Sequence, residues 1–287
     1  MSGYGAVLGI DVGFSPREPT TCFCGLAWGP REILLRFASC RAHRGERRRA
    51  LLRAIGPCDR LEAVALDGPL TKGLRLVPHY RSAEALLSRG VFQKRGKPGA
   101  TSSPAGQELH RHATRLAGLV LECEEEGAFD LSAASHDMPI HEKAVVEAFP
   151  NQFLAALVAE GEFPELKRDA SDRFWEISLR KGRLAKLVDR LLPGRTTDRP
   201  LEEITDHDER GAFACALTAL CIARGRFVGV GDPDDGAIFL PPREAWAMAA
   251  ESESWLTRAL DAGLRSVQST ARRHHENHTR AQVIVVD

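Results

Sequence analysis

The stretch GAVLGIDVG (residues 5–13) is an apolar run that ends in an aspartate set between small residues. Two further β-rich segments follow at 20–28 and 32–39, and short connectors rich in proline and glycine join the three, which predicts an antiparallel meander. A predicted helix over 45–55 then leads to a strand over 61–70. A strand reached through a helix pairs in parallel with a neighbour by a right-handed crossover. The first half therefore predicts an α/β fold with a mixed sheet.

The second half adds one core strand, KAVVEAFP at 143–150, and several helices. The helices are predicted over 108–126, 172–192, 208–224 and 243–265, with a short one over 81–88. The helix over 208–224 is apolar nearly all round, which predicts that it is buried. We expect a single domain over 1–265, including a basic insertion and helix over 71–142, and a polar, His-rich C-terminal tail over 266–287.

Composition excludes several classes of protein. The 287 residues carry 39 basic and 39 acidic side chains, so no global attraction to a polyanion is expected. The seven cysteines are scattered and odd in number, which does not fit a secreted disulfide framework. No signal peptide is visible, and the longest apolar run is too short to span a bilayer. These features predict a cytoplasmic protein with no membrane partner.

Three acidic residues lie on or at the ends of core strands: Asp11, Asp67 and Glu147. A carboxylate in an apolar strand loses solvation, which is costly unless a cation or hydrogen bonds compensate for it. If strands 5–13 and 61–70 are adjacent and parallel, Asp11 and Asp67 project from neighbouring positions. Their repulsion then raises the pKa of one of them unless a metal ion lies between them. The alternative is a set of solvated carboxylates at the edge of a sheet.

A fourth carboxylate follows from helix geometry. Asp208 lies at the start of the buried helix, on a face that continues with small residues and permits close approach to a sheet. Asp206 and Glu209 instead match the spacing of a helix cap. Four converging carboxylates suit Mg²⁺ or Mn²⁺. Two such ions about 4 Å apart can activate a water and stabilise the leaving oxygen in phosphodiester hydrolysis.

The insertion has a strong local charge. Residues 71–115 contain nine Lys or Arg and two Glu. Within its Gly- and Pro-rich loop, Lys and Arg side chains are of the kind that hold phosphates without reading sequence. The candidate nucleic-acid contacts are Arg81, Arg89, Lys94, Arg95 and Lys97. A solvated loop is the alternative, and Arg81 and Glu84 also have the spacing of a simple helical ion pair.

Six segments carry a resemblance over nearly the whole chain. They are LGIDVG (8–13), ALDGPL (65–70), Arg81-x-x-Glu84, VEAFP (146–150), HDERGAFACALTAL (207–220) and VGDPDDGAIFLPP (230–242). In this order they resemble the domain of unknown function 429 family, predicted nucleases with an RNase H-like fold, and more distantly RuvC-type resolvases. The resemblance implies an RNase H-like mixed sheet flanked by helices and a metal-dependent nuclease acting on DNA or RNA. It also implies Asp11, Asp67, Glu147 and Asp208 as the acidic active-site residues.

One position departs from the family's pattern. Where the family often has a second acidic residue one turn into the last helix, this chain has Gly211, which leaves the metal site one ligand poorer. Two other functions therefore stay open. One is a non-enzymatic module that binds nucleic acid or a protein on a degenerate site. The other is an actin-like or sugar-kinase-like ATPase, because GIDVG resembles its first phosphate motif, although no second Asp-x-Gly motif is present.

Overall fold

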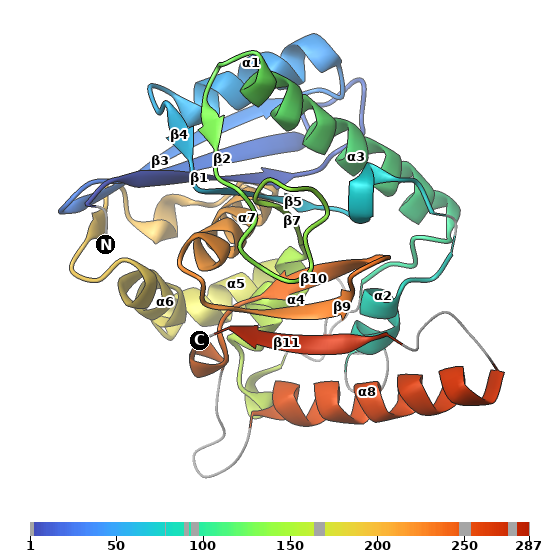
Figure 1. The fold of residues 1–287 in the computed structure, drawn as a ribbon. Helices are drawn as coiled ribbons and strands as arrows, with labels where there is room; N and C mark the ends of the chain where they lie inside the picture. Colours follow the sequence, from blue (N-terminus) through green and yellow to red (C-terminus); the bar gives the residue numbers. More distant parts are fainter. Residues whose placement is uncertain are drawn as a thin grey trace.

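The structure is a computed structural model that describes residues 3–77, 79–88, 92, 98–163, 170–246, 254–274 and 280–286. Its main sheet consists of β1 (Gly5–Asp11), β2 (Thr21–Trp28), β3 (Glu32–Cys40), β5 (Ala63–Asp67), β7 (Val145–Ala148), β8 (Thr196–Thr197), β9 (Phe227–Asp232), β10 (Gly236–Leu240) and β11 (Gln282–Val286). These nine strands are ordered β11-β9-β10-β7-β5-β1-β2-β3-β8 (Figure 1). Two short strands, β4 (Arg60–Leu61) and β6 (Asp130–Leu131), pair with each other separately.

The sheet is mixed, as the sequence predicts. Strands β1, β2 and β3 form an antiparallel meander. On the other side of β1, strands β5, β7 and β10 follow one another in parallel. Strands β9 and β11 then continue the sheet with antiparallel pairing. The carboxyl ends of β1, β5 and β7 therefore meet at one edge of the sheet, where the three predicted strand carboxylates lie.

Helices cover both faces of the sheet (Figure 1). The α-helices are α1 (Arg44–Ile55), α2 (Ser82–Leu87), α3 (Pro104–Glu125), α4 (Pro150–Ala156), α5 (Ala170–Arg180), α6 (Arg183–Leu191), α7 (His207–Ala223) and α8 (Trp255–His274). Short 3-10 helices occur at Lys72–Leu74, Glu160–Glu162, Leu201–Glu203 and Arg243–Ala245. Helices α1 and α3 pack on one face, over a core that includes Leu8 and Leu66. Helix α7 packs on the other face with α4, α5 and α6, over a core that includes Val7 and Ala65.

Helix α7 is the element that brings the last candidate ligand to the sheet. Every residue from Ala212 to Ile222 is buried, which confirms the prediction from its apolar sequence. It lies directly against β1 at Gly9, where an added Cβ atom would be 2.1 Å from the backbone nitrogen of Ala216. Only glycine permits so close an approach, so Gly9 sets the depth at which α7 crosses the strand ends.

Two predicted helices differ in the structure. The helix expected over 172–192 is divided into α5 and α6, because Gly182 adopts a left-handed conformation with φ of 65°. The helix expected over 243–265 begins only at Trp255 and continues to His274. The boundary expected between the domain and the C-terminal tail, at residue 265, thus lies inside α8. Within the expected tail, β11 pairs with β9 at the edge of the sheet.

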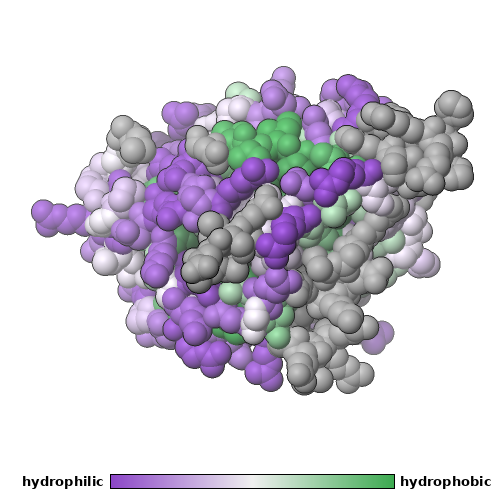
Figure 2. Space-filling view, turned by 90° about the horizontal axis from the view of Figure 1, so that it is seen from below, coloured by the Kyte–Doolittle hydropathy of each residue, from purple (hydrophilic) through white to green (hydrophobic). Residues whose placement is uncertain are grey.

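Strand β11 presents an apolar surface on a face of the molecule that is otherwise largely hydrophilic. Figure 2 shows a largely hydrophilic face with an apolar area at the place that β11 occupies in Figure 1. Its residues Val283–Val286 are only partly buried. No described helix combines the length and the hydropathy that crossing a membrane requires.

Candidate metal site

Asp11 and Asp67 lie side by side at the carboxyl ends of two adjacent parallel strands. Their Cα atoms are paired in the register of β1 and β5, which confirms the predicted adjacency. Residues directly opposite each other on neighbouring strands project from the same face of a sheet. For this pair it is the face that α7 covers, because Val7 and Ala65, two or four residues earlier on the same strands, pack in that core.

The two carboxyl groups are held in an environment that disfavours their charged forms. Burial raises the pKa of Asp67 to about 7, and the negative charge of Glu147 adds to this effect, while His207 opposes it. Burial also raises the pKa of Asp11 well above its ordinary value, with further contributions from Asp67 and Asp208. A cation placed between two such carboxylates would stabilise their charged forms, so the pair is suited to a metal ion.

The pair opens into a small cavity of about 60 Å³. Its other polar walls are Asn151 from the first turn of α4, Ser171 and Asp172 from α5, and His207 and Arg210 from α7. The side-chain oxygen Oδ1 of Asn151 is buried and has no hydrogen-bond partner in the described structure. An unpaired buried carbonyl oxygen is costly, and a cation would satisfy it.

Asp172 organises the two basic side chains at this cavity. Its Oδ1 accepts a hydrogen bond from Nη1 of Arg210 at 3.0 Å, and its Oδ2 lies 3.1 Å from Nδ1 of His207. Nε of Arg210 donates to the backbone oxygen of Ile204 at 3.0 Å. These contacts fix both basic residues beside the carboxylate pair.

Glu147 does not join Asp11 and Asp67, and the expectation that it converges with them is wrong. It is paired with Leu66, whereas Asp67 is paired with Ala148. Because side chains alternate between the two faces of a strand, Glu147 leaves β7 on the opposite face from the aspartates. Both of its carboxylate oxygens are already bound there.

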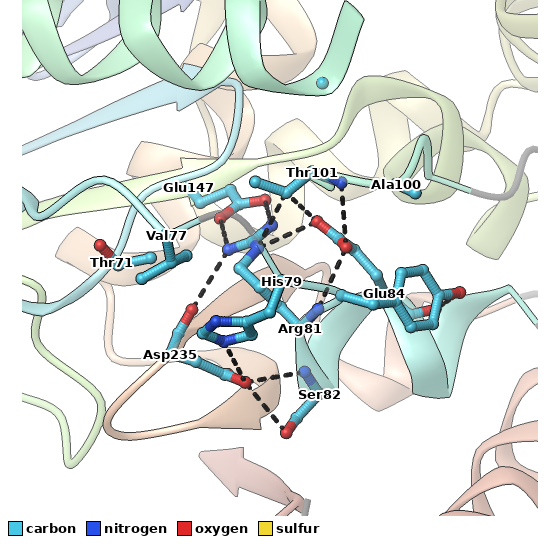
Figure 3. Close-up of polar contacts among 12 residues, drawn as sticks. Thr71, Val77, His79, Arg81, Ser82, Glu84, Ala100, Thr101, Glu147 and Asp235 are labelled. Atoms are coloured by element: carbon cyan, nitrogen blue, oxygen red, sulfur yellow. Dashed lines mark hydrogen bonds and ion pairs between the residues drawn. The ribbon is translucent and has the colours of Figure 1, made fainter. Parts of the chain in front are cut away.

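The partner of Glu147 is Arg81, in a two-pronged ion pair (Figure 3). Nη1 and Nη2 of Arg81 donate to Oε2 and Oε1 of Glu147 at 2.7 and 2.8 Å. Oε2 also accepts from the backbone N–H of Leu70 at 2.9 Å. Only 1% of the Arg81 surface and 3% of the Glu147 surface is exposed. Two parallel charge-assisted hydrogen bonds of this kind are strong and geometrically specific.

Arg81 binds a second glutamate as well, so the predicted ion pair with Glu84 is confirmed. Nε of Arg81 donates to Oε1 of Glu84 at 3.0 Å, and Thr101 donates to the same carboxylate (Figure 3). Burial alone would lower the pKa of Arg81, but Glu147 and Glu84 raise it above its ordinary value, so the charge is retained. With no exposed surface to offer, Arg81 does not have the access that its predicted role as a nucleic-acid contact requires.

Asp208 lies near the carboxylate pair without lining the cavity. It belongs to the first turn of α7, and its charge contributes to the raised pKa of Asp11. Asp206 precedes the helix and accepts a hydrogen bond from the backbone N–H of Glu209 at 3.1 Å, which confirms its predicted capping role. The other predicted nucleic-acid contacts lie outside the described residues; they are Arg89, Lys94, Arg95 and Lys97.

Gly211 provides space for Asp11. A Cβ atom added to Gly211 would be 2.7 Å from Oδ2 and 2.8 Å from Cγ of Asp11. The carboxylate of Asp11 therefore lies where a side chain at this position would begin. A side chain at position 211 would need the space that the carboxylate of Asp11 occupies. Gly211 is therefore not simply a place from which a metal ligand is missing.

Gly211→Ala is accordingly expected to lower the free energy of unfolding, by about 1–3 kcal/mol, because the added methyl group overpacks the site. Gly118→Ala is the matched control, since Gly118 is also inside a long helix but an added Cβ would have no atom within 4 Å. There the usual helical preference for alanine is expected to stabilise by roughly 0.5–1 kcal/mol. Urea denaturation measures both, and equal effects of the two variants would contradict the close contact with Asp11.

The raised pKa of Asp67 also predicts how stability depends on pH. A carboxyl group whose pKa is higher in the folded than in the unfolded protein binds more protons when folded. The contribution of Asp67 to the free energy of unfolding is complete below its pKa in the unfolded protein, near 3.8, and is lost as the pH rises through its pKa in the folded protein, about 7. We therefore expect the metal-free protein to become less stable between about pH 4 and pH 7, with a shallower slope for Asp67→Asn. An identical slope for both proteins would show that Asp67 titrates normally.

Sequence reasoning missed several polar walls of the cavity, among them Asn151, Asp172, His207 and Arg210. Asn151 directly follows the strand predicted over 143–150, and a polar residue at that place is a usable signal. Among the residues that the structure describes, no group of three or more His, Cys, Asp or Glu side chains is arranged to hold a metal ion. The oxygen-bearing side chains that line the cavity are the carboxylates of Asp11, Asp67 and Asp172, the amide of Asn151 and the hydroxyl of Ser171, and the carboxylate of Asp172 is bound to Arg210 and His207.

Comparison with protein-family models, with curated proteins and with solved structures finds no match for this chain. The geometry described above is therefore the basis on which function is argued.

Proposed function

We propose that this protein is a divalent-metal-dependent nuclease with an RNase H-like fold, in which Asp11 and Asp67 bind one Mg²⁺ or Mn²⁺ ion. The observation that carries the proposal is the pairing of these two aspartates in register at adjacent strand ends, in a cavity that is also lined by Asn151, whose Oδ1 is buried without a hydrogen-bond partner in the described structure. Carboxylate and amide oxygens are the ligands that hard cations prefer.

The arrangement of elements supports the fold part of the proposal. A three-stranded antiparallel meander, parallel strands beside its first strand, and flanking helices are what the resemblance implies. Asp11 and Asp67 lie at the ends of the first strand and its parallel neighbour. A fold alone does not define an activity, so the site carries the functional argument.

The cavity fits one ion better than the two that the sequence predicts. Its volume of about 60 Å³ corresponds to roughly two water molecules. Mg²⁺ commonly uses one or two carboxylates and keeps several waters, so it does not need a complete set of protein ligands. Glu147, bound to Arg81, is not required in this arrangement.

A bound ion would supply a Lewis acid that polarises a phosphoryl oxygen and lowers the pKa of a water molecule. The chain's own residues would bind and orient the substrate. Arg210 is held by Asp172 through Nη1, and its Nη2 has no hydrogen-bond partner among the described residues. That nitrogen is available to a phosphate oxygen, for which the planar guanidinium is well suited. His207, held by the same carboxylate, is placed to donate to a second oxygen.

Cleavage of a panel of substrates tests this proposal. Single-stranded, duplex and branched DNA and RNA are incubated with the protein in Mg²⁺, in Mn²⁺ and in EDTA. Cleavage of at least one substrate that requires the metal is the expected result. Absence of cleavage on every substrate in both metals, by protein shown to be folded, would contradict nuclease activity.

A non-enzymatic binding module is the second candidate, and one observation favours it. No group of three metal-ligating acidic, His or Cys side chains is present in the described part of the chain, and the third predicted carboxylate is engaged by Arg81. In that case the panel would show binding of nucleic acid that does not depend on the metal and is not followed by cleavage.

A further inference from the structure

A second and much larger hollow lies at the opposite end of β1. It is a groove of about 1070 Å³ whose walls come from the start of β1, the end of β2, the start of β3, residues 57–62 and the end of α7. Gly5 lines it, and Asp11 stands six residues further along the same strand. At about 3.3 Å per residue the groove is roughly 20 Å from the carboxylate pair, so it is a separate site.

Four arginines line the groove: Arg31, Arg36, Arg60 and Arg224. None of them has a carboxylate within ion-pair distance in the described structure, unlike Arg44, Arg48, Arg183 and Arg210, each of which forms an ion pair. Arg60 makes one long hydrogen bond, 3.4 Å to the hydroxyl of Ser132. Guanidinium groups with unused donors are well suited to phosphate, which they bind through two parallel hydrogen bonds.

Three acidic residues share the walls, namely Glu32, Asp59 and Glu62. Glu62 is half-buried, and burial raises its pKa while the nearby Arg224 and Arg60 oppose this effect. The basic residues exceed the acidic ones by one, and this excess favours an anion over a cation. The groove therefore presents both a positive wall and a set of acceptors for the neutral part of a ligand.

Two aromatic residues, the buried Trp28 and the exposed Tyr4, also line the groove. Trp28 is 3% exposed, and the guanidinium of Arg224 stacks 4.5 Å from the centre of its ring. Nε1 of Trp28 and Nε of Arg224 are buried donors without a hydrogen-bond partner in the described structure. Tyr4 also lines the groove, with 70% of its surface exposed. An exposed aromatic ring is a platform on which a planar base can stack.

We propose that this groove binds a nucleoside phosphate. The phosphate is bound by the arginines, chiefly the two exposed ones, Arg31 and Arg60, and the planar base stacks on Tyr4. This site does not depend on the proposed nuclease activity, and it needs no metal ion.

Isothermal titration calorimetry of the full chain in EDTA tests the proposal, with adenosine monophosphate, adenosine and inorganic phosphate as probes. Saturable binding of adenosine monophosphate is expected, with adenosine and phosphate each weaker by about tenfold or more, since each keeps only half of the contacts. The double variant Arg31→Ala/Arg60→Ala should weaken nucleotide binding by at least about tenfold. Tyr4→Ala should weaken adenosine monophosphate but leave phosphate unchanged.

Arg180→Ala is the control, because Arg180 is an exposed arginine on α5 that does not line the groove. It should bind like the wild type. Arg31 and Arg60 are themselves exposed, so the double variant is expected to fold, and circular dichroism checks this. No saturable binding at millimolar nucleotide, or equal binding by the double variant and the Arg180→Ala control, would overturn the proposal. Binding of phosphate as tight as that of the nucleotide would overturn the role of Tyr4.

Discussion

Asp11→Asn is expected to lower metal-dependent cleavage on the order of a thousandfold or more. The substitution keeps the shape of the side chain but removes a charge that the metal ion needs, and lost metal stabilisation of the transition state amounts to several kcal/mol. Folding should survive, because Asp11 lies beside Asp67 and near Asp208, and removing one of several like charges relieves repulsion in the metal-free protein.

The rate is measured on the best substrate of the panel, with wild type, Asp11→Asn and Asp261→Asn purified in parallel. Asp261 is an exposed aspartate on α8, and its substitution controls for the loss of a negative charge. It should retain the wild-type rate. Equal cleavage by all three proteins would identify a contaminating nuclease. If Asp67→Asn, measured in the same way, is inactive while Asp11→Asn keeps full activity, Asp11 does not belong to the site.

Arg81→Met is expected to destabilise the fold by about 3–5 kcal/mol, the usual effect of removing one partner from a buried charged pair. The substitution leaves Glu147 and Glu84 buried next to each other without a positive charge between them. Arg81 also connects segments distant in sequence, because Nη1 donates to the backbone oxygen of Leu70 at 3.2 Å and to that of Asp235 at 3.5 Å.

Arg173→Met is the matched control. Arg173 also forms an ion pair with a glutamate three residues away, but both side chains are more than half exposed. Exposed pairs contribute little, so this variant should unfold at nearly the wild-type urea concentration. A similarly small effect of Arg81→Met would show that the buried network does not hold the fold together.

Glu147→Gln separates the two roles considered for Glu147. If Glu147 acts as the partner of Arg81, the substitution should lower the free energy of unfolding while the folded protein keeps its metal affinity. If Glu147 acts as a metal ligand, the substitution should lower the metal affinity of the protein with little change in its free energy of unfolding. The ion pair in the structure predicts the first result.

The position of Asp11 and Asp67 could be predicted because both end long apolar strands joined by a predicted crossover. The face of Glu147 could not. Strand β7 has only four residues, all buried, so no alternation of polar and apolar residues fixes its phase. A shift of one residue moves a side chain to the other face of a sheet. The glutamate was thus placed on the correct strand and on the wrong face.

Contacts between distant parts of the chain account for the other differences. The spacing of Arg81 and Glu84 predicts their pair, but nothing local indicates Glu147, which is 66 residues away. Asp172 binds Arg210 across 38 residues, and an acidic residue early in an amphipathic helix has no signal that separates it from an exposed one. Gly211, in contrast, was noticed as a missing acid, and only the fold shows that the carboxylate of Asp11 fills its space.

Binding of Mn²⁺ measured by isothermal titration calorimetry tests the central claim most directly, because it needs no substrate. The wild type and Asp67→Asn are compared at pH 8, above the pKa of about 7 that burial gives to Asp67. We predict one ion bound per chain by the wild type and no measurable binding at this site by Asp67→Asn. Absence of binding by the wild type, or equal binding by the two proteins, would contradict a metal ion held between Asp11 and Asp67.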